Sequence, residues 1–303
     1  MLDYWPIYQH EAGIMLNRLF ASRKRPFLAG LNKPQHIEID VSGSKLELDV
    51  PAHNDASSPE QQAPLSHFNL YSNEGFDPDE GSFSTALLMG RDLDLYAAPF
   101  GLSSSMGTIS VKVSIDRVDC LPEGMTCLNP EHFEQVVMRF IHRLGPGRHF
   151  GLVGPRAWKL LPTDHLPWVV YEMHDDLTDV IEPTSHHFTE YSSYAVTPLD
   201  DRYILRIMFL NTGSPPVEFS RRVRDQICCS LKLTLSADLT RRIAEVKNKW
   251  PDAKISEYRE PEQWVSPKWR YGRTSEGEPR IVILEAGSPA PEFEFENTAN
   301  TTN

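Results

Sequence analysis

The chain has 303 residues, of which 40% are hydrophobic and 24% are charged, and these proportions are typical of a globular protein. A formal net charge of -12 would repel nucleic-acid phosphates, and no basic stripe is present, so nucleic acid is not an expected partner. Charged residues interrupt the first twenty positions, and no later apolar run is long enough to cross a membrane. We therefore expect a cytoplasmic protein without a membrane span.

Residues 1–32 are predicted to form a helical lead to the main domain. Leu16, Leu19 and Phe20 share one face of an amphipathic helix, which we expect to dock on the rest of the protein. The basic cluster at 23–25 follows near the end of that helix, where cations offset the partial negative charge of unpaired carbonyls.

The segment "HIEIDVSGSKLELDV" predicts a β-hairpin. Apolar residues alternate with polar ones on both sides of a Ser42-Gly43-Ser44 turn. Two loops rich in proline, glycine and polar residues then precede the strands "DLDLYAAPF" and "GTISVKVSIDRV". A helix follows, with Asn129 as its N-cap, Pro130 in its first turn and a stop at "GPG".

Three strands, "LPWVVYEM", "HFTEYSSYAVTP" and "RYILRIMFLN", are predicted in the second half of the chain. The helical pattern of "PVEFSRRVRDQICC" leads directly into a strand at "SLKLTL". Residues 237–286 are predicted to form a helical and tryptophan-rich extension that ends in the short strand "RIVILE", and residues 287–303 to form a disordered tail. The expected fold class is α+β, an antiparallel β-sheet flanked by helices.

This order of elements resembles the PsbP-like α/β sandwich, a family that includes photosystem accessory proteins, the DcrB group and the Eag chaperones of type VI secretion. The phrases "LELDVP", "LVGPRAW" and "ICCSLKL" carry the likeness, which covers about residues 33–235 within a predicted sandwich domain at 33–236. The resemblance implies a non-catalytic scaffold whose curved sheet holds another protein. The N-terminal helix, the proline-rich loop and the segment after the last strand depart from the family pattern.

The segment "EMHDDLTDVIEPTSHH" contains the candidate functional residues. The acidic side chains Asp175, Asp176, Asp179 and Glu182 crowd one loop between two strands, which makes a negative patch for a basic partner. A metal site that uses His174, His186 and His187 with these aspartates is the alternative. Neighbouring residues of a strand point to opposite faces, and no H-E-x-x-H spacing is present, so a solvated loop remains a third interpretation.

Other reactive residue types lack the spacing that catalysis needs. Ser103–Ser105 do not fit the G-x-S-x-G pattern of a nucleophile elbow, and the four cysteines lack C-x-x-C pairs. Cys120 and Cys127 flank a turn and could pair if oxidised, whereas Cys228 and Cys229 are expected to serve as small apolar fillers. The aromatic residues Trp264, Trp269, Tyr258 and Tyr271 could form a recognition patch or pack the extension.

Two functional hypotheses follow. The first is a bacterial binding protein without a cofactor, either an immunity protein that neutralises a secreted toxin or a chaperone that escorts an effector, with a basic protein as partner. The second is a metal-dependent hydrolase that uses the histidine and aspartate loop.

Overall fold

The protein has an α+β fold that is dominated by antiparallel sheet. The computed structural model describes residues 18, 20–78, 82–97, 105–144, 152–161, 166–175, 191–261, 268–273, 279–285 and 293–296. One sheet has the order β1-β6-β7-β11-β10-β9-β8, with β5 paired to β6. A second sheet has the order β12-β3-β2-β4, and β13 and β14 pair with each other. Among the described residues, no helix is long and apolar enough to cross a membrane.

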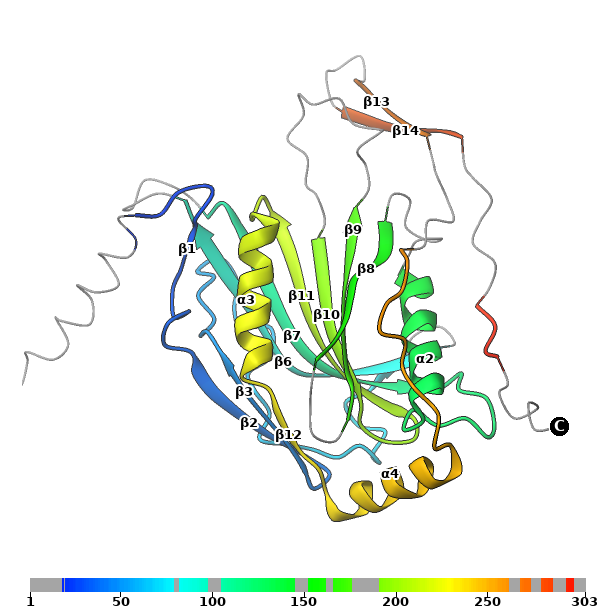
Figure 1. Ribbon diagram of the computed structural model, residues 1–303. Coiled ribbons are helices and arrows are strands. Elements are labelled where there is room, and N and C mark those ends of the chain that lie inside the picture. The colour runs from blue at the N-terminus through cyan, green and yellow to red at the C-terminus, as the bar shows by residue number, and fades with distance from the viewer. Residues whose placement is uncertain are drawn as a thin grey trace, which may run out of the picture. The chain divides into compact units, whose positions relative to one another are not determined.

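The strands have the following bounds: β1 Phe27–Leu28, β2 Gln35–Val41, β3 Ser44–Val50, β4 His67–Phe68, β5 Asp77–Pro78, β6 Phe83–Tyr96, β7 Gly107–Val118, β8 Leu152–Leu161, β9 Trp168–Asp175, β10 Tyr191–Pro198, β11 Tyr203–Gly213, β12 Lys232–Thr234, β13 Lys268–Arg273 and β14 Pro279–Glu285. The helices are α2 Pro130–Leu144, α3 Val217–Cys229 and α4 Ala237–Lys249. Figure 1 shows these elements in chain order by colour.

The chain divides into two compact units made of interleaved segments. Unit 1 contains residues 1–72, 87–113 and 208–236, and unit 2 contains residues 73–86, 114–207 and 237–303. The long strands β6, β7 and β11 contribute residues to both units. The division expected from the sequence, at residues 32, 236 and 286, stays a prediction.

The β2–β3 hairpin of unit 1 confirms the sequence prediction. Ser42 and Gly43 form its two-residue turn with φ angles of 49° and 86°, which is the left-handed backbone that suits the twist of a hairpin. Val41 pairs with Ser44 and Gln35 pairs with Val50 at the two ends of the ladder. The apolar residues of both strands are buried, so the polar residues lie together on the opposite face.

The helices begin where the sequence indicates. The side chain of Asn129 accepts hydrogen bonds from the backbone N–H groups of Glu131 and His132 and caps α2, as predicted. In α3 the predicted apolar face is buried through Phe219, Val223 and Ile227. The chain then passes directly from α3 into β12 beside β3, as Figure 1 shows.

Two long strands differ from the sequence prediction, and the shorter strands β1, β4, β5 and β13 were not predicted either. β6 begins at Phe83 rather than at Asp92, because nearly all of its residues are buried on both faces and the expected alternation is absent. β8 was not predicted as a strand. It contains Pro155 and two register irregularities against β9, and it lies at the edge of its sheet, where proline is tolerated.

A buried ion pair lies between β7 and β11 in unit 2. Asp116 is fully buried, and it accepts hydrogen bonds from Nε and Nη2 of Arg206 at 2.6 and 2.8 Å. Thr85 donates a third bond to the same carboxylate, and the Arg206 guanidinium lies 4.8 Å from the ring centre of Phe140 on α2. Burial disfavours the charged guanidinium, but attraction and hydrogen bonding to Asp116 outweigh this effect and raise the pKa of Arg206.

The segment after α4 packs on unit 2 through polar contacts. The buried carboxylate of Glu134 on α2 accepts bonds from Ser256 N and Arg259 Nε. The indole of Trp158 donates to Ser256 O at 2.7 Å. Farther along, in the region expected to be a disordered tail, Glu296 exchanges two hydrogen bonds with Gln135 of α2. Parts of the C-terminal region are therefore held against the same helix.

Candidate functional site

The acidic loop chosen from the sequence falls almost entirely outside the described residues. Asp175 is the last residue of β9, where its backbone pairs with Leu152, and Asp176, Asp179 and Glu182 lie beyond the described range. The predicted role of these four residues in partner binding stays a prediction.

The alternative metal site is only partly described. His174 lies on β9, where its Nε2 is 2.8 Å from Oε2 of the fully buried Glu172, and its ring packs edge-on against Tyr191. His186 and His187 lie outside the described residues. The histidine that can be described is thus held by a carboxylate on its own strand, and whether the loop binds metal stays a prediction.

The other reactive side chains occupy structural positions. The hydroxyl of Ser105 bonds to the backbone oxygens of Leu95 and Gly107, whereas Ser103 and Ser104 lie outside the described residues. All four cysteines are free. Cys228 is buried, in line with its role as an apolar filler, whereas Cys229 is exposed.

The aromatic patch of the extension is described only in part. Tyr258 is 67% exposed. Trp264 lies outside the described range, as do the side chains of Trp269 and Tyr271 on β13.

The sheet of unit 1 presents a continuous polar face. Its side chains come from β2, β3, β12 and β4, and the cross-strand pairs that form it are His36 with Asp49, Glu38 with Glu47, Asp40 with Lys45, Glu47 with Lys232 and Asp40 with His67. We call these eight residues the polar face. Carboxylates predominate on it, and Glu38 lies directly opposite Glu47, but Lys45 and Lys232 lie beside this pair of like charges.

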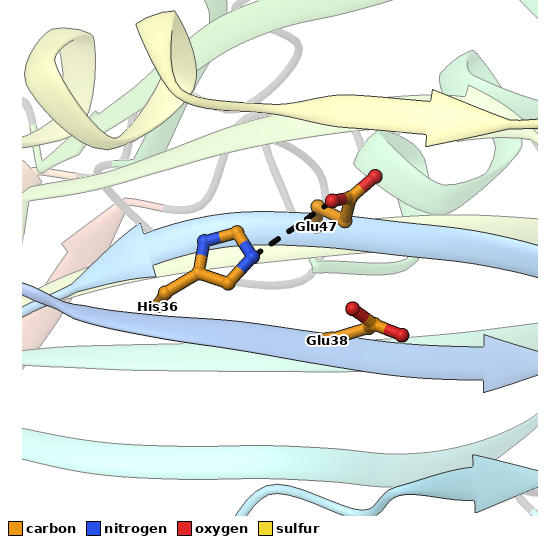
Figure 2. A group of neighbouring side chains, drawn as sticks. All are labelled: His36, Glu38 and Glu47. Carbon is orange, nitrogen blue, oxygen red and sulfur yellow. Dashed lines mark ion pairs between the residues drawn. The ribbon is translucent and has the colours of Figure 1, made fainter.

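Three side chains of the polar face converge on one point. His36, Glu38 and Glu47 each offer a ligand atom, and these atoms all lie within 4.8 Å of one another. Figure 2 shows His36 and Glu38 on β2 and Glu47 on β3, with the imidazole of His36 directed toward Glu47 at 3.8 Å. His36 and Glu38 are exposed, whereas the side chain of Glu47 is 15% exposed.

Two lysines neutralise this group. Lys45 Nζ lies 2.7 Å from Glu38 and 3.6 Å from Glu47, and Lys232 Nζ lies 3.1 Å from the other oxygen of Glu47. The hydrogen bond from Lys232 lowers the pKa of Glu47, and the hydrogen bond to Glu38 raises the pKa of Lys45. Both shifts favour the charged forms, so the polar face carries ionised groups at neutral pH.

The outer edge of β2 is open next to this face. Asp40 N donates to Ser66 O and Ser42 N to Phe68 O, both on the side of β2 away from β3. Residues two apart on a strand direct their main-chain groups to the same side, so His36 and Glu38 also direct theirs away from β3. Among the described residues, neither of these two backbone amides has a hydrogen-bond partner.

A groove runs along that open edge. Its far wall is formed by Pro64, Leu65 and Ser66. The backbone N–H of Leu65 bonds to the backbone oxygen of Leu88 on β6 and not to β2. The groove is open to solvent, has a volume of about 540 Å³ and is lined on the β2 side by residues 35–38. We call it the β2 groove.

The base of the β2 groove is held by a buried arginine. Arg91 donates to Glu60, to the backbone oxygens of Val50 and Pro51, and to the side-chain oxygen of Gln35. The bond to Gln35 links the β2 side of the groove to β6, and the other bonds hold Val50, Pro51 and Glu60 against the same arginine. The β2 groove therefore offers the unpaired backbone amides of His36 and Glu38 along a strand edge. Such an edge suits an extended peptide better than a reacting substrate.

Sequence reasoning passed over both features. The alternation of the hairpin places His36, Glu38, Glu47 and Asp49 on one face, so this signal is present in the sequence. No protein-family model matches the chain, and no curated protein matches it.

Proposed function

We propose that the protein is a non-catalytic binding protein that accepts an extended segment of a protein partner along the open edge of β2. The observation that supports this proposal is the pair of unpartnered backbone amides at His36 and Glu38, which face the β2 groove. An added strand would pair with these groups, and main-chain hydrogen bonds of this kind give affinity without requiring a particular sequence.

The charge of the protein favours a basic segment. The polar face next to the groove contains four carboxylates, at Glu38, Asp40, Glu47 and Asp49, and two lysines, and the whole chain carries a net charge of -12. A partner with lysine or arginine beside its extended segment would be attracted over a distance and held in register.

The class of partner comes from the sequence resemblance. Within the proposal, the fold is a PsbP-like α/β sandwich, and the partner is a secreted toxin that the protein neutralises or an effector that it escorts in the bacterial cytoplasm. Hydrogen bonds between the main chain of β2 and the main chain of the partner do not depend on the partner's side chains. Toxins or effectors that differ in sequence could therefore bind in the same way.

A single backbone position tests the strand-addition mode. Proline at position 38 removes the outward N–H and leaves the ladder to β3 intact, whereas alanine removes the same carboxylate and keeps the N–H. Random peptides displayed on phage would be selected against the full chain, and an enriched peptide would be titrated against both variants.

We expect the enriched peptides to contain lysine or arginine. Their affinity for Glu38→Pro should be about tenfold weaker than for Glu38→Ala, because proline removes a main-chain hydrogen bond to the peptide and prevents its close approach to β2. Equal affinities for the two variants would rule out strand addition at β2. Failure to enrich any peptide on the folded chain would count against the groove as a binding site.

A further inference from the structure

We infer that His36, Glu38 and Glu47 form a binding site for one divalent transition-metal ion, with Zn²⁺ as the cation that the donor set suits best. One imidazole nitrogen and two carboxylate oxygens are ligands that zinc accepts, and three protein ligands leave a coordination position open. This inference is independent of strand addition, because it concerns side chains rather than the main chain of β2.

The hairpin places the three donors without help from elsewhere in the chain. Glu38 and Glu47 are direct cross-strand partners, and His36 lies two residues before Glu38 on the same face. Ligand atoms on one tetrahedral zinc ion lie about 3.3 Å apart. The donors already lie within 4.8 Å of one another, and rotation of the exposed His36 and Glu38 side chains can close the difference.

A fourth residue prepares the imidazole for this role. Nδ1 of His36 lies 2.9 Å from Oδ1 of Asp49, and Nε2 is the atom that faces Glu47. A carboxylate that accepts the Nδ1 proton fixes the tautomer in which Nε2 has its lone pair free, and zinc-bound histidines usually have such a partner. Asp49 would therefore act as a positioning residue and not as a ligand.

The position of Lys45 indicates that the site attracts a cation. Its ammonium group lies within 4.0 Å of both glutamates, between the two carboxylates that a metal ion would bridge. A lysine side chain on a β-strand can swing into solvent, because 38% of it is exposed. Lys45 would thus be displaced by the metal ion, and it would compete with that ion for the glutamates.

This competition gives the inference a distinctive test. If the group is only a charge ladder, removal of Lys45 leaves the glutamates repelling each other and creates no specific metal site. If it is a metal site, Lys45→Met removes a competing charge while it preserves the aliphatic stem, so zinc should bind more tightly. The two interpretations therefore predict different results for one substitution.

The experiment is a calorimetric titration of the full, metal-stripped chain with Zn²⁺, with Mg²⁺ as a comparison. We expect one Zn²⁺ per chain, with affinity lost in Glu38→Gln/Glu47→Gln and weakened about tenfold or more in His36→Ala and Asp49→Asn. Lys45→Met should bind at least several-fold more tightly than the wild-type chain. Circular dichroism of each variant would verify that the fold is retained.

His67→Ala is the matched control, because His67 lies on the same face, is similarly exposed and has an aspartate partner, Asp40, at 2.6 Å. Its zinc affinity should equal that of the wild-type chain. The inference is wrong if the wild-type chain binds no Zn²⁺, if the double glutamine variant binds it unchanged, if His67→Ala and His36→Ala lose affinity equally, or if Lys45→Met binds no tighter.

Discussion

His36 and Glu38 lie two positions apart on β2, and each residue takes part in two surfaces. Their side chains belong to the polar face, within 4.8 Å of Glu47, while their main-chain groups face the β2 groove. Because side chains and main-chain groups of a strand point in perpendicular directions, substitutions can separate the two surfaces. Glu47→Gln alters the polar face alone, whereas Glu38→Pro alters both.

The buried pair of Asp116 and Arg206 predicts a large and non-additive loss of stability. Asp116→Asn removes the charge that compensates a guanidinium of which only 10% is exposed. We expect a loss of about 3–5 kcal/mol in the free energy of unfolding, measured by urea denaturation, because an uncompensated charge stays buried.

Replacement of both partners provides the control for this prediction. Asp116→Leu combined with Arg206→Met should cost less than Asp116→Asn alone, since neither charge then remains buried. If the double variant loses as much stability relative to the wild-type chain as Asp116→Leu and Arg206→Met lose in sum, the pair does not act as a unit.

Strand prediction from the sequence succeeded where apolar and polar residues alternate, whether the polar side is largely exposed, as in the hairpin, or buried, as at Ser114 and Asp116 of β7. The β2–β3 hairpin and β7 have regular alternation and clear turns, and the structure contains both. β6 lacks that signal over its first half, because buried residues such as Leu88 and Met89 follow one another. The bulges and Pro155 of β8 likewise interrupt the period that a strand prediction needs.

The candidate site was less accessible to sequence reasoning than the fold. The pairing of Glu47 with Lys232 joins residues far apart in the chain, and no local pattern encodes it. The edge of β2 at His36 and Glu38 is open because the backbone N–H of Leu65 bonds to Leu88 of β6 and not to β2. The first feature arises from the tertiary pairing of β12 with β3, and the second from the packing of a loop whose sequence indicates only polar, turn-rich chain.

His132 should make the protein sensitive to mild acid. Its ring is buried, its Nδ1 accepts the backbone N–H of Thr126, and Trp250 packs edge-on against it. Burial lowers the pKa of His132 below its ordinary value of 6.5. The unfolded chain then binds a proton more readily than the folded chain, so stability falls as the pH falls through 6.5 toward the lower folded pKa.

The measurement for His132 is urea denaturation at about pH 7.5 and about pH 5.5, compared with His132→Asn, which keeps an acceptor and cannot titrate in this range. We expect the wild-type chain to lose more stability between these two conditions than the variant does. Identical pH dependence in both proteins would show that His132 does not contribute.

Gly107 should tolerate no side chain, in contrast to Gly124. Both have positive φ angles, 155° and 85°, but a Cβ at Gly107 would lie 2.4 Å from the backbone oxygen of Thr212, whereas a Cβ at Gly124 would meet nothing within 4 Å. Gly124→Ala should cost about 1 kcal/mol from backbone strain, and Gly107→Ala more than about 2 kcal/mol. Thermal unfolding of the two variants compares them directly, and equal losses would contradict the close approach of Gly107 and Thr212.

Residue-resolved amide hydrogen exchange tests the open edge of β2 most directly. In the free chain the amides of His36 and Glu38 should exchange rapidly, while those of Ile37 and Ile39, which bond to β3, should be protected. With a peptide selected for binding, His36 and Glu38 should become protected as well. Slow exchange at His36 and Glu38 in the free chain, or rapid exchange that persists in the complex, would contradict strand addition at β2.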